Sequence, residues 1–104
     1  APRFLTVYTP PAPVTATALA TGPTTVALSW TSSLSSIFAA YRVYRSTSSG
    51  VGNEATLLTT ITAQATTTYD DTGLTPGTTY YYRVDTVDRS GLAARSLVVS
   101  ARPQ

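Results

Sequence analysis

The fold is decided by one stretch of the sequence, Tyr69-Asp-Asp-Thr-Gly-Leu-Thr-Pro-Gly-Thr-Thr-Tyr-Tyr-Tyr-Arg-Val84. It has the pattern of a strand, a tight corner rich in glycine and proline, and a second strand that opens with three tyrosines. Tyr80, the first of the three, can bury its ring and direct its hydroxyl back to a backbone group upstream. Such a corner closes one end of a β-sandwich, so the stretch predicts an all-β fold.

The rest of the chain consists of short β-prone segments separated by turn residues. This spacing, with no helical period of useful length, is typical of an antiparallel two-sheet sandwich. We expect seven strands, at residues 14–20, 25–31, 40–46, 56–62, 66–70, 79–88 and 96–101. The chain is long enough for one domain, which we place at residues 12–104.

Side chains alternate between the two faces of each predicted strand. The inward positions predict a core of Trp30, Tyr41, Val43, Leu74, Tyr80, Tyr82 and Val84, with Trp30 at its centre. Tyr69 and Thr86 also fall on inward positions. The last strand allows two phases, in which either Val98 alone or Leu97 together with Val99 faces the core.

The composition excludes several classes of site. Without cysteine or histidine, the chain can form no disulfide, no zinc or haem site through those residues, and no Ser–His or Cys–His nucleophile. The net charge of +2 comes from seven arginines spread along the chain, whereas nucleic-acid binding needs clustered basic residues. No apolar run approaches the ~20 residues of a membrane span. We therefore expect no cofactor, no nucleic-acid partner and no membrane-spanning segment.

Asp70 and Asp71 are the first acidic residues to consider for catalysis or metal binding. They are adjacent in a predicted strand, so their side chains should point to opposite faces rather than across a cleft. Asp70-Asp71-Thr72 can hold Ca²⁺ together with backbone carbonyls, or Asp71 can cap the turn by accepting backbone N–H bonds, and we favour the cap.

Asp85 and Asp88 lie at the end of a predicted strand, where we expect them to pair with Arg83 or Arg89. No pair of carboxylates is then left facing a cleft. We predict no catalytic residue, no metal-binding residue and no enzymatic activity.

The arrangement of these segments resembles that of a fibronectin type III domain. The resemblance is carried by Val26-x-Leu28-x-Trp30, Tyr41-x-Val43, Leu74-x-Pro76-x-Thr78-x-Tyr80-x-Tyr82-x-Val84 and the turn glycine Gly91, in family order over residues 12–102. The Asp71-Thr-Gly-Leu and Tyr80-Tyr-Tyr-Arg-Val sequences look like those of secreted prokaryotic copies. The family implies an immunoglobulin-like sandwich that spaces, links, adheres or assembles without catalysis. Integrin binding is not implied, because the relevant loop reads Asp88-Arg-Ser-Gly91 and lacks Arg-Gly-Asp.

Residues 1–11 lie outside the predicted sandwich and form an N-terminal arm. Its prolines suit a linker, but Phe4, Leu5, Val7 and Tyr8 are more apolar and more β-prone than a linker needs. The arm can be a linker, an edge strand of its own domain, or a strand that pairs with the edge of a neighbouring copy. We favour the third interpretation, which makes these four residues candidates for partner binding.

Tyr44 and Tyr81 are further candidates for partner binding. Both should point outward from neighbouring strands, beside Arg42 and Arg83. Outward aromatic side chains can stack on sugar rings or contact a partner protein. The alternative is that they pair across the strands and only stiffen the sheet.

These features predict a non-catalytic extracellular module that acts through structure and interaction. The leading hypothesis is a subunit of a surface filament or other assembly, joined to further copies through its N-terminal strand. The alternative is a spacer or accessory module of a secreted polysaccharide-degrading enzyme. Direct carbohydrate binding through Tyr44 and Tyr81 is a third hypothesis.

Overall fold

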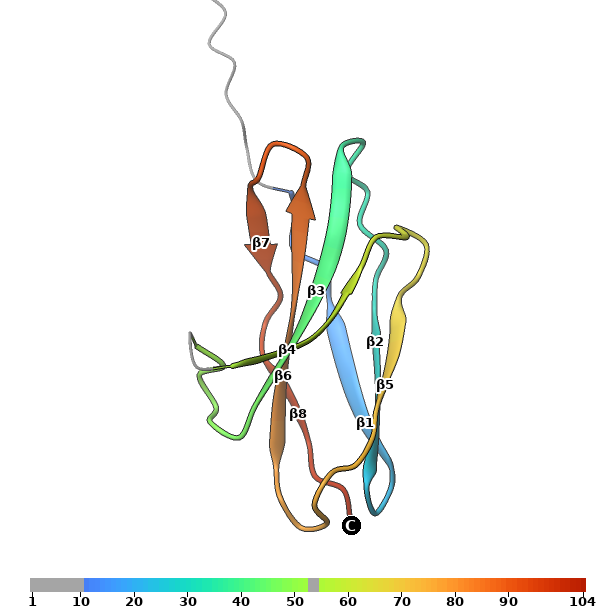
Figure 1. Cartoon of the computed structure of the whole chain (residues 1–104), viewed down its shortest axis with the longest axis vertical. Helices are drawn as coiled ribbons and strands as arrows, with labels where there is room; N and C mark the ends of the chain where they lie inside the picture. The colour runs from blue at the N-terminus through green and yellow to red at the C-terminus, as the bar shows by residue number, and fades with distance from the viewer. Residues whose placement is uncertain (1–10, 53–54) are drawn as a thin grey trace, which may run out of the picture.

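The computed structural model of the chain describes residues 11–52 and 55–104. These residues form two antiparallel sheets packed face to face (Figure 1). The strands are β1 (Ala16–Gly22), β2 (Thr25–Trp30), β3 (Phe38–Ser46), β4 (Thr56–Ile61), β5 (Thr68–Asp71), β6 (Tyr80–Asp88), β7 (Ala93–Arg95) and β8 (Val99–Ala101). Apart from Pro11, the predicted arm lies outside the described residues.

One sheet has the strand order β1-β2-β5, and the other has the order β4-β3-β6-β7, with β8 also paired to β6. All pairings are antiparallel. The prediction of an all-β antiparallel sandwich is therefore confirmed. The described residues contain eight strands where seven were expected, because the strand predicted at residues 96–101 is shortened to β8 and a further strand, β7, forms just before it.

The interruption between β7 and β8 has a local cause at Ser96. The Val84 N–H donates to the Ser96 Oγ at 2.9 Å, in the place where an uninterrupted strand would offer a backbone carbonyl. The Ser96 N–H still donates to the Val84 carbonyl at 2.9 Å. The chain then leaves the ladder as a bulge, so Leu97 is 87% exposed and Val98 is 38% exposed, while Val99 packs against the core. Of the two predicted phases, the one with Leu97 and Val99 in the core is correct for Val99 and wrong for Leu97.

The core lies between the sheets and is centred on aromatic side chains. Trp30 meets Tyr41 edge to face, with ring centroids 5.5 Å apart, and Phe38 lies 4.6 Å from Tyr41 on another side. All seven side chains expected in the core are buried: Trp30, Tyr41, Val43, Leu74, Tyr80, Tyr82 and Val84. Thr86 is buried as well, and Tyr69 is half-buried against the core.

The corner before β6 closes one end of the sandwich. The Thr75 N–H donates to the Tyr80 hydroxyl at 2.9 Å, and this bond holds the pKa of Tyr80 below its usual value. Gly73 and Gly77 adopt φ angles of 72° and 82°, which side chains with a Cβ rarely tolerate. Tyr80 therefore makes the upstream backbone bond that the sequence predicted.

Replacing Trp30 by alanine tests the centre of the core. The indole ring is buried against Tyr41, so its removal leaves a cavity, and we expect Trp30→Ala to lower the free energy of unfolding by about 3–5 kcal/mol. Leu19→Ala is the matched control, because Leu19 is 68% exposed. Urea denaturation measures both variants. A Trp30→Ala protein that unfolds at the same urea concentration as Leu19→Ala would show that Trp30 is not the centre of the core.

Candidate interaction surfaces

The outer face of the five-stranded sheet carries the first group of candidate residues. Opposite residues of β3 and β6 share a face, and the register pairs Tyr44 with Arg83 and Ser46 with Tyr81. Tyr44 and Tyr81 are therefore diagonal neighbours on this face, as predicted for outward-facing positions. Both side chains are half-buried rather than fully exposed.

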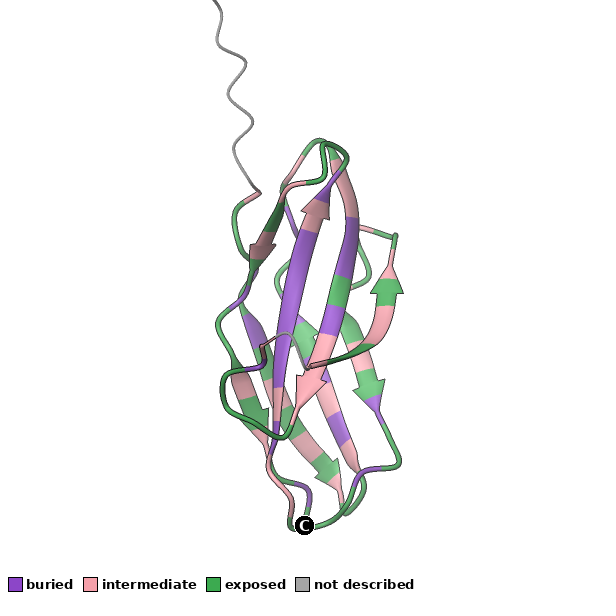
Figure 2. Cartoon of the chain, turned by 60° about the vertical axis from the view of Figure 1, so that its left-hand side comes forward, coloured by how far each residue is buried: buried purple, intermediate pink, exposed green. Residues whose placement is uncertain are grey.

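The outer face of β6 is more buried than expected for a strand whose alternate side chains face solvent. Figure 2 shows β6 buried along nearly its whole length, although every second side chain points away from the core. Val51, in the loop between β3 and β4, is fully buried although it lies outside both sheets. This loop therefore covers part of the outer face of β6.

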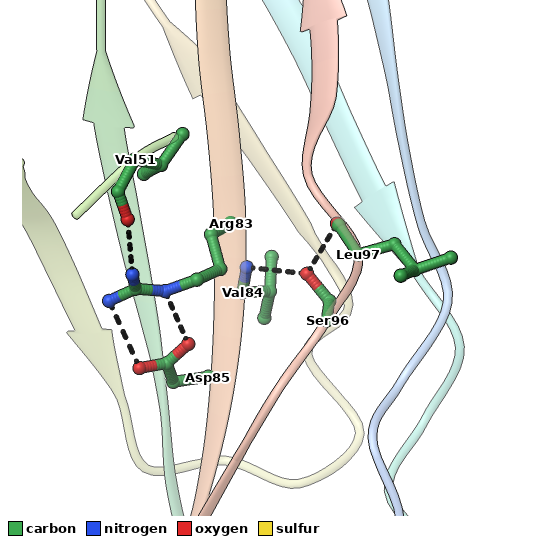
Figure 3. A network of polar contacts seen from close by, with 6 residues as sticks. All are labelled: Val51, Arg83, Val84, Asp85, Ser96 and Leu97. Carbon is green, nitrogen blue, oxygen red and sulfur yellow. Dashed lines mark hydrogen bonds and ion pairs between the residues drawn. The ribbon is translucent and has the colours of Figure 1, made fainter. Parts of the chain in front are cut away.

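Arg83 joins that loop to the sheet (Figure 3). Its Nε donates to Asp85 Oδ1 at 2.8 Å, its Nη2 donates to Asp85 Oδ2 at 3.3 Å, and its Nη1 donates to the Val51 carbonyl. Its guanidinium carbon also lies 4.5 Å from the centre of the Tyr44 ring, so one face of that ring is already in contact with a cation. The expected pairing of Asp85 with Arg83 is present.

Asp71 has a different role from the turn cap that the sequence suggested. Arg45 donates to both of its carboxylate oxygens, at 2.9 and 3.0 Å, and the Tyr82 hydroxyl donates to Oδ2 at 2.8 Å. Asp71 is on β5 and the other two are on the opposite sheet, so this cluster ties the two sheets together. Burial, followed by the bond to Asp71, raises the pKa of Tyr82.

Asp88 does not pair with Arg89, and that expectation was wrong. Its Oδ1 accepts bonds from the N–H and hydroxyl of Ser90, at 3.0 and 2.6 Å, and from the Leu92 N–H at 3.1 Å. These bonds close the turn between β6 and β7 and hold the pKa of Asp88 below its usual value, with the Ser90 hydroxyl as the largest cause. Arg89 instead donates to the Ser36 carbonyl.

Gln64 is a structural residue that sequence reasoning missed. Its Nε2 donates to the backbone carbonyls of Ser33 and Ser35 at 2.7 and 2.9 Å, and its backbone carbonyl accepts from the Tyr41 hydroxyl at 2.7 Å. The loop between β2 and β3 is thereby held at the pole where the described chain begins. The sequence carries no signal for this, because the bonding groups are about thirty residues apart.

The second surface is a groove along the open side of the sandwich, which we call the seam groove. It is lined by residues 13–16, Arg95 and residues 97–99, and it has a volume of about 350 Å³. One wall belongs to the sheet of β1 and the other to the sheet of β7 and β8. Figure 3 shows Leu97 directed away from β6 and toward β1. The bulge after Ser96 therefore places an exposed leucine at the edge of an apolar groove.

Comparisons with known proteins agree with this architecture. The chain matches the fibronectin type III domain family over residues 9–102. It belongs to the fibronectin type III family. The family resemblance inferred from the sequence is thus confirmed, and domains of this family are generally non-catalytic modules that mediate protein–protein interactions. No curated protein matches the chain.

Several solved structures are similar to this fibronectin type III domain. An Fn3-like protein from Clostridium thermocellum is 32% identical with a TM-score of 0.72, and the match covers 92% of this chain and 96% of the other. Pectate lyase PelI from Erwinia chrysanthemi is 26% identical with a TM-score of 0.76, over 89% of this chain but only 28% of the lyase. The sixth such domain of a human fibronectin type III domain-containing protein is 22% identical, with a TM-score of 0.76 and coverage of 94% and 91%, which shows the shared fold alone.

Residues 11–52 and 55–104 contain no group of three or more acidic, histidine or cysteine side chains arranged to hold a metal ion. The same residues include no helix that is long and apolar enough to cross a membrane.

Replacing Arg83 tests the buried ion pair on the outer face. Arg83→Met leaves the Asp85 carboxylate buried without its partner, so we expect a loss of about 3–5 kcal/mol in the free energy of unfolding. The exposed Arg102, in the segment after β8, gives the control Arg102→Met, which should change stability by less than about 0.5 kcal/mol. Equal denaturation midpoints for the two variants would contradict the burial of this pair.

The turn at Asp88 predicts a dependence of stability on pH. Because folding lowers the pKa of Asp88, its carboxylate stabilises the fold fully above the unfolded-state pKa of about 3.9, and this contribution is lost as the pH falls through the folded-state pKa. Asp88→Asn removes the titration, so its melting temperature should fall less steeply than that of the parent between about pH 4 and 2. Asp70→Asn, at an exposed site, should keep the slope of the parent. Parallel curves for the parent and Asp88→Asn would disprove the assignment.

Proposed function

We propose that this fibronectin type III domain is a non-catalytic extracellular module that joins copies of the chain into a surface filament or other assembly through residues 4–8. The proposal is carried by the seam groove, where Leu97 and Val98 are exposed at the junction of two sheet edges. Exposed apolar side chains around a groove are typical of surfaces that bind another protein.

The contacts of the acidic residues support a structural role. Asp71 ties the two sheets together, Asp85 neutralises a buried arginine and Asp88 closes a turn. Each of these carboxylates accepts hydrogen bonds that hold the fold together.

The positions of the chain ends also support assembly. Figure 1 shows the C-terminus at one pole of the sandwich and the described N-terminal end at the other. Residues 4–8 precede the described chain by only a few positions, so they are attached at the second pole. An apolar segment at one end and an acceptor elsewhere on the surface form a heterologous contact, which repeats into a filament when its rotation does not close a ring.

Deletion of residues 1–10 tests the role of the arm. We expect the full chain to form concentration-dependent oligomers or filaments and the deletion variant to remain a monomer, because the shortened chain keeps the sandwich but loses its apolar segment. Sedimentation velocity and electron microscopy measure the particle size. As a control, Arg3→Ala alters the arm without removing an apolar residue. If the shortened chain assembles like the parent, the arm does not join the copies.

The second candidate function is a spacer or accessory module of a secreted polysaccharide-degrading enzyme. It is favoured by the similarity to a domain that forms about a quarter of each pectate lyase chain. The half-buried Tyr44 and Tyr81 would then be the side chains to contact carbohydrate. A catalytic domain encoded next to this one would support the spacer, and so would a strictly monomeric full chain.

A further inference from the structure

We propose that the seam groove of one copy receives residues 4–8 of a second copy as an added β-strand. This inference rests on the proposed function, since it names the acceptor for the arm. Nothing in the family match assigns a role to the groove. The groove lies between two strands that belong to different sheets, so a guest strand there would bridge both halves of the sandwich.

The backbone on the β1 side of the groove can pair with a guest strand. Thr15 directs its backbone groups toward the loop that follows β2, because its carbonyl accepts from the Thr31 N–H at 3.0 Å and its N–H donates to the Thr31 Oγ1 at 2.9 Å. Backbone groups alternate in direction along an extended chain. Those of Val14 and Ala16 therefore face the seam, on the side where β1 has no paired strand. They offer main-chain hydrogen bonds of the kind that bind added strands.

The side chains of the groove match the chemistry of residues 4–8. The walls present Val14, Ala16, Leu97, Val98 and Val99, while Arg95 is the charged residue at the rim. In an extended guest, Leu5 and Val7 share one face and Phe4 and Tyr8 share the other. The two aliphatic side chains suit the floor of the groove beside the exposed Leu97 and Val98, and the aromatic rings then lie on the outer side of the guest strand.

The lengths also match. Five residues of extended chain span about 16 Å. The walls of the groove consist of four consecutive residues, 13–16, on one side and a stretch of five, 95–99, on the other. A five-residue strand is thus about as long as the walls of the groove.

The positions of the prolines favour a second copy over the chain's own arm as the donor. Residues 4–8 can reach their own groove only if the chain reverses between Thr9 and Ala12. Thr9, Pro10 and Ala12 each precede a proline, which biases all three toward extended backbone. These residues therefore disfavour a tight turn between residues 4–8 and the domain. Pro13, which follows them, already lines the groove. The sequence of the connection therefore favours a neighbouring copy over the chain's own groove as the acceptor of residues 4–8.

Disulfide trapping tests the pairing, because the natural chain contains no cysteine. Val7→Cys and Leu97→Cys are placed in separate full-length chains that carry tags of different mass and are expressed together. After mild oxidation, we expect a mixed disulfide between the two chains at about ten-fold or more the yield obtained when Leu97→Cys is replaced by Leu19→Cys. Leu19 is the matched control, since it is also an exposed leucine, 68% accessible, but does not line the groove.

Three outcomes of this experiment overturn the proposal. The first is equal trapping by the Leu19→Cys control. The second is no mixed disulfide at all. The third is an internal disulfide in a chain carrying both Val7→Cys and Leu97→Cys while separate chains fail to react, which would mean that the arm fills its own groove.

A second variant separates failure of the groove from failure of the arm. Leu97→Asp places a charge in the groove at an exposed site, so it should fold, and we expect it to weaken assembly by about ten-fold or more in concentration. Leu19→Asp should assemble like the parent. If deletion of residues 1–10 abolishes assembly but Leu97→Asp does not, the arm joins the copies through a different acceptor. If the deletion itself has no effect, the proposed function fails as well.

Discussion

The burial of β6 on both of its faces is the constraint on which the rest of the sandwich depends. This strand pairs with β3, β7 and β8, so a change in its register would displace three neighbours at once. Its inward side chains, Tyr82 and Val84, fill the core, while its outward pair, Arg83 and Asp85, is covered by the loop between β3 and β4. A buried charge is tolerated only when it is paired and hydrogen-bonded. The ion pair and the Val51 carbonyl meet that requirement. Part of the outer face therefore serves to stabilise the fold.

The same strand, β6, determines the backbone path at the open side of the sandwich. A continuous last strand would present a regular edge, which is a template for uncontrolled pairing. Here Ser96 bonds to the backbone of Val84 through its side chain as well as its N–H, and the chain bulges immediately afterwards. The bulge breaks the regular edge and directs Leu97 toward the β1 side. A bulge of this kind discourages regular strand addition at this edge, while the seam groove lies open beside it.

How well the sequence predicted each feature depends on how far apart in the chain the interacting residues lie. The Tyr80 corner is local, because its bonding partners are five positions apart, and the core follows from alternation within strands, so both were predictable. The bonds of Asp71 with Arg45 and Tyr82 span 26 and 11 residues and depend on how the sheets face each other. The seam groove joins segments about eighty residues apart in the chain. The bulge was missed for another reason, because no pattern of apolar residues indicates that the Ser96 hydroxyl takes the place of a carbonyl.

The two proposed functions make opposite demands on the ten residues before the sandwich. A donor strand must be free to leave its own domain and dock in another, and its affinity then comes from buried apolar side chains and main-chain bonds. A linker between two domains of one chain is tethered at both ends, and its apolar side chains would have no recess to fill. Phe4, Leu5, Val7 and Tyr8 carry more apolar surface than a tether requires, whereas the prolines at 10, 11 and 13 provide the stiffness that either role can use. The apolar content of the arm, more than its prolines, is therefore what distinguishes the two functions, and it favours a strand that docks on a neighbour.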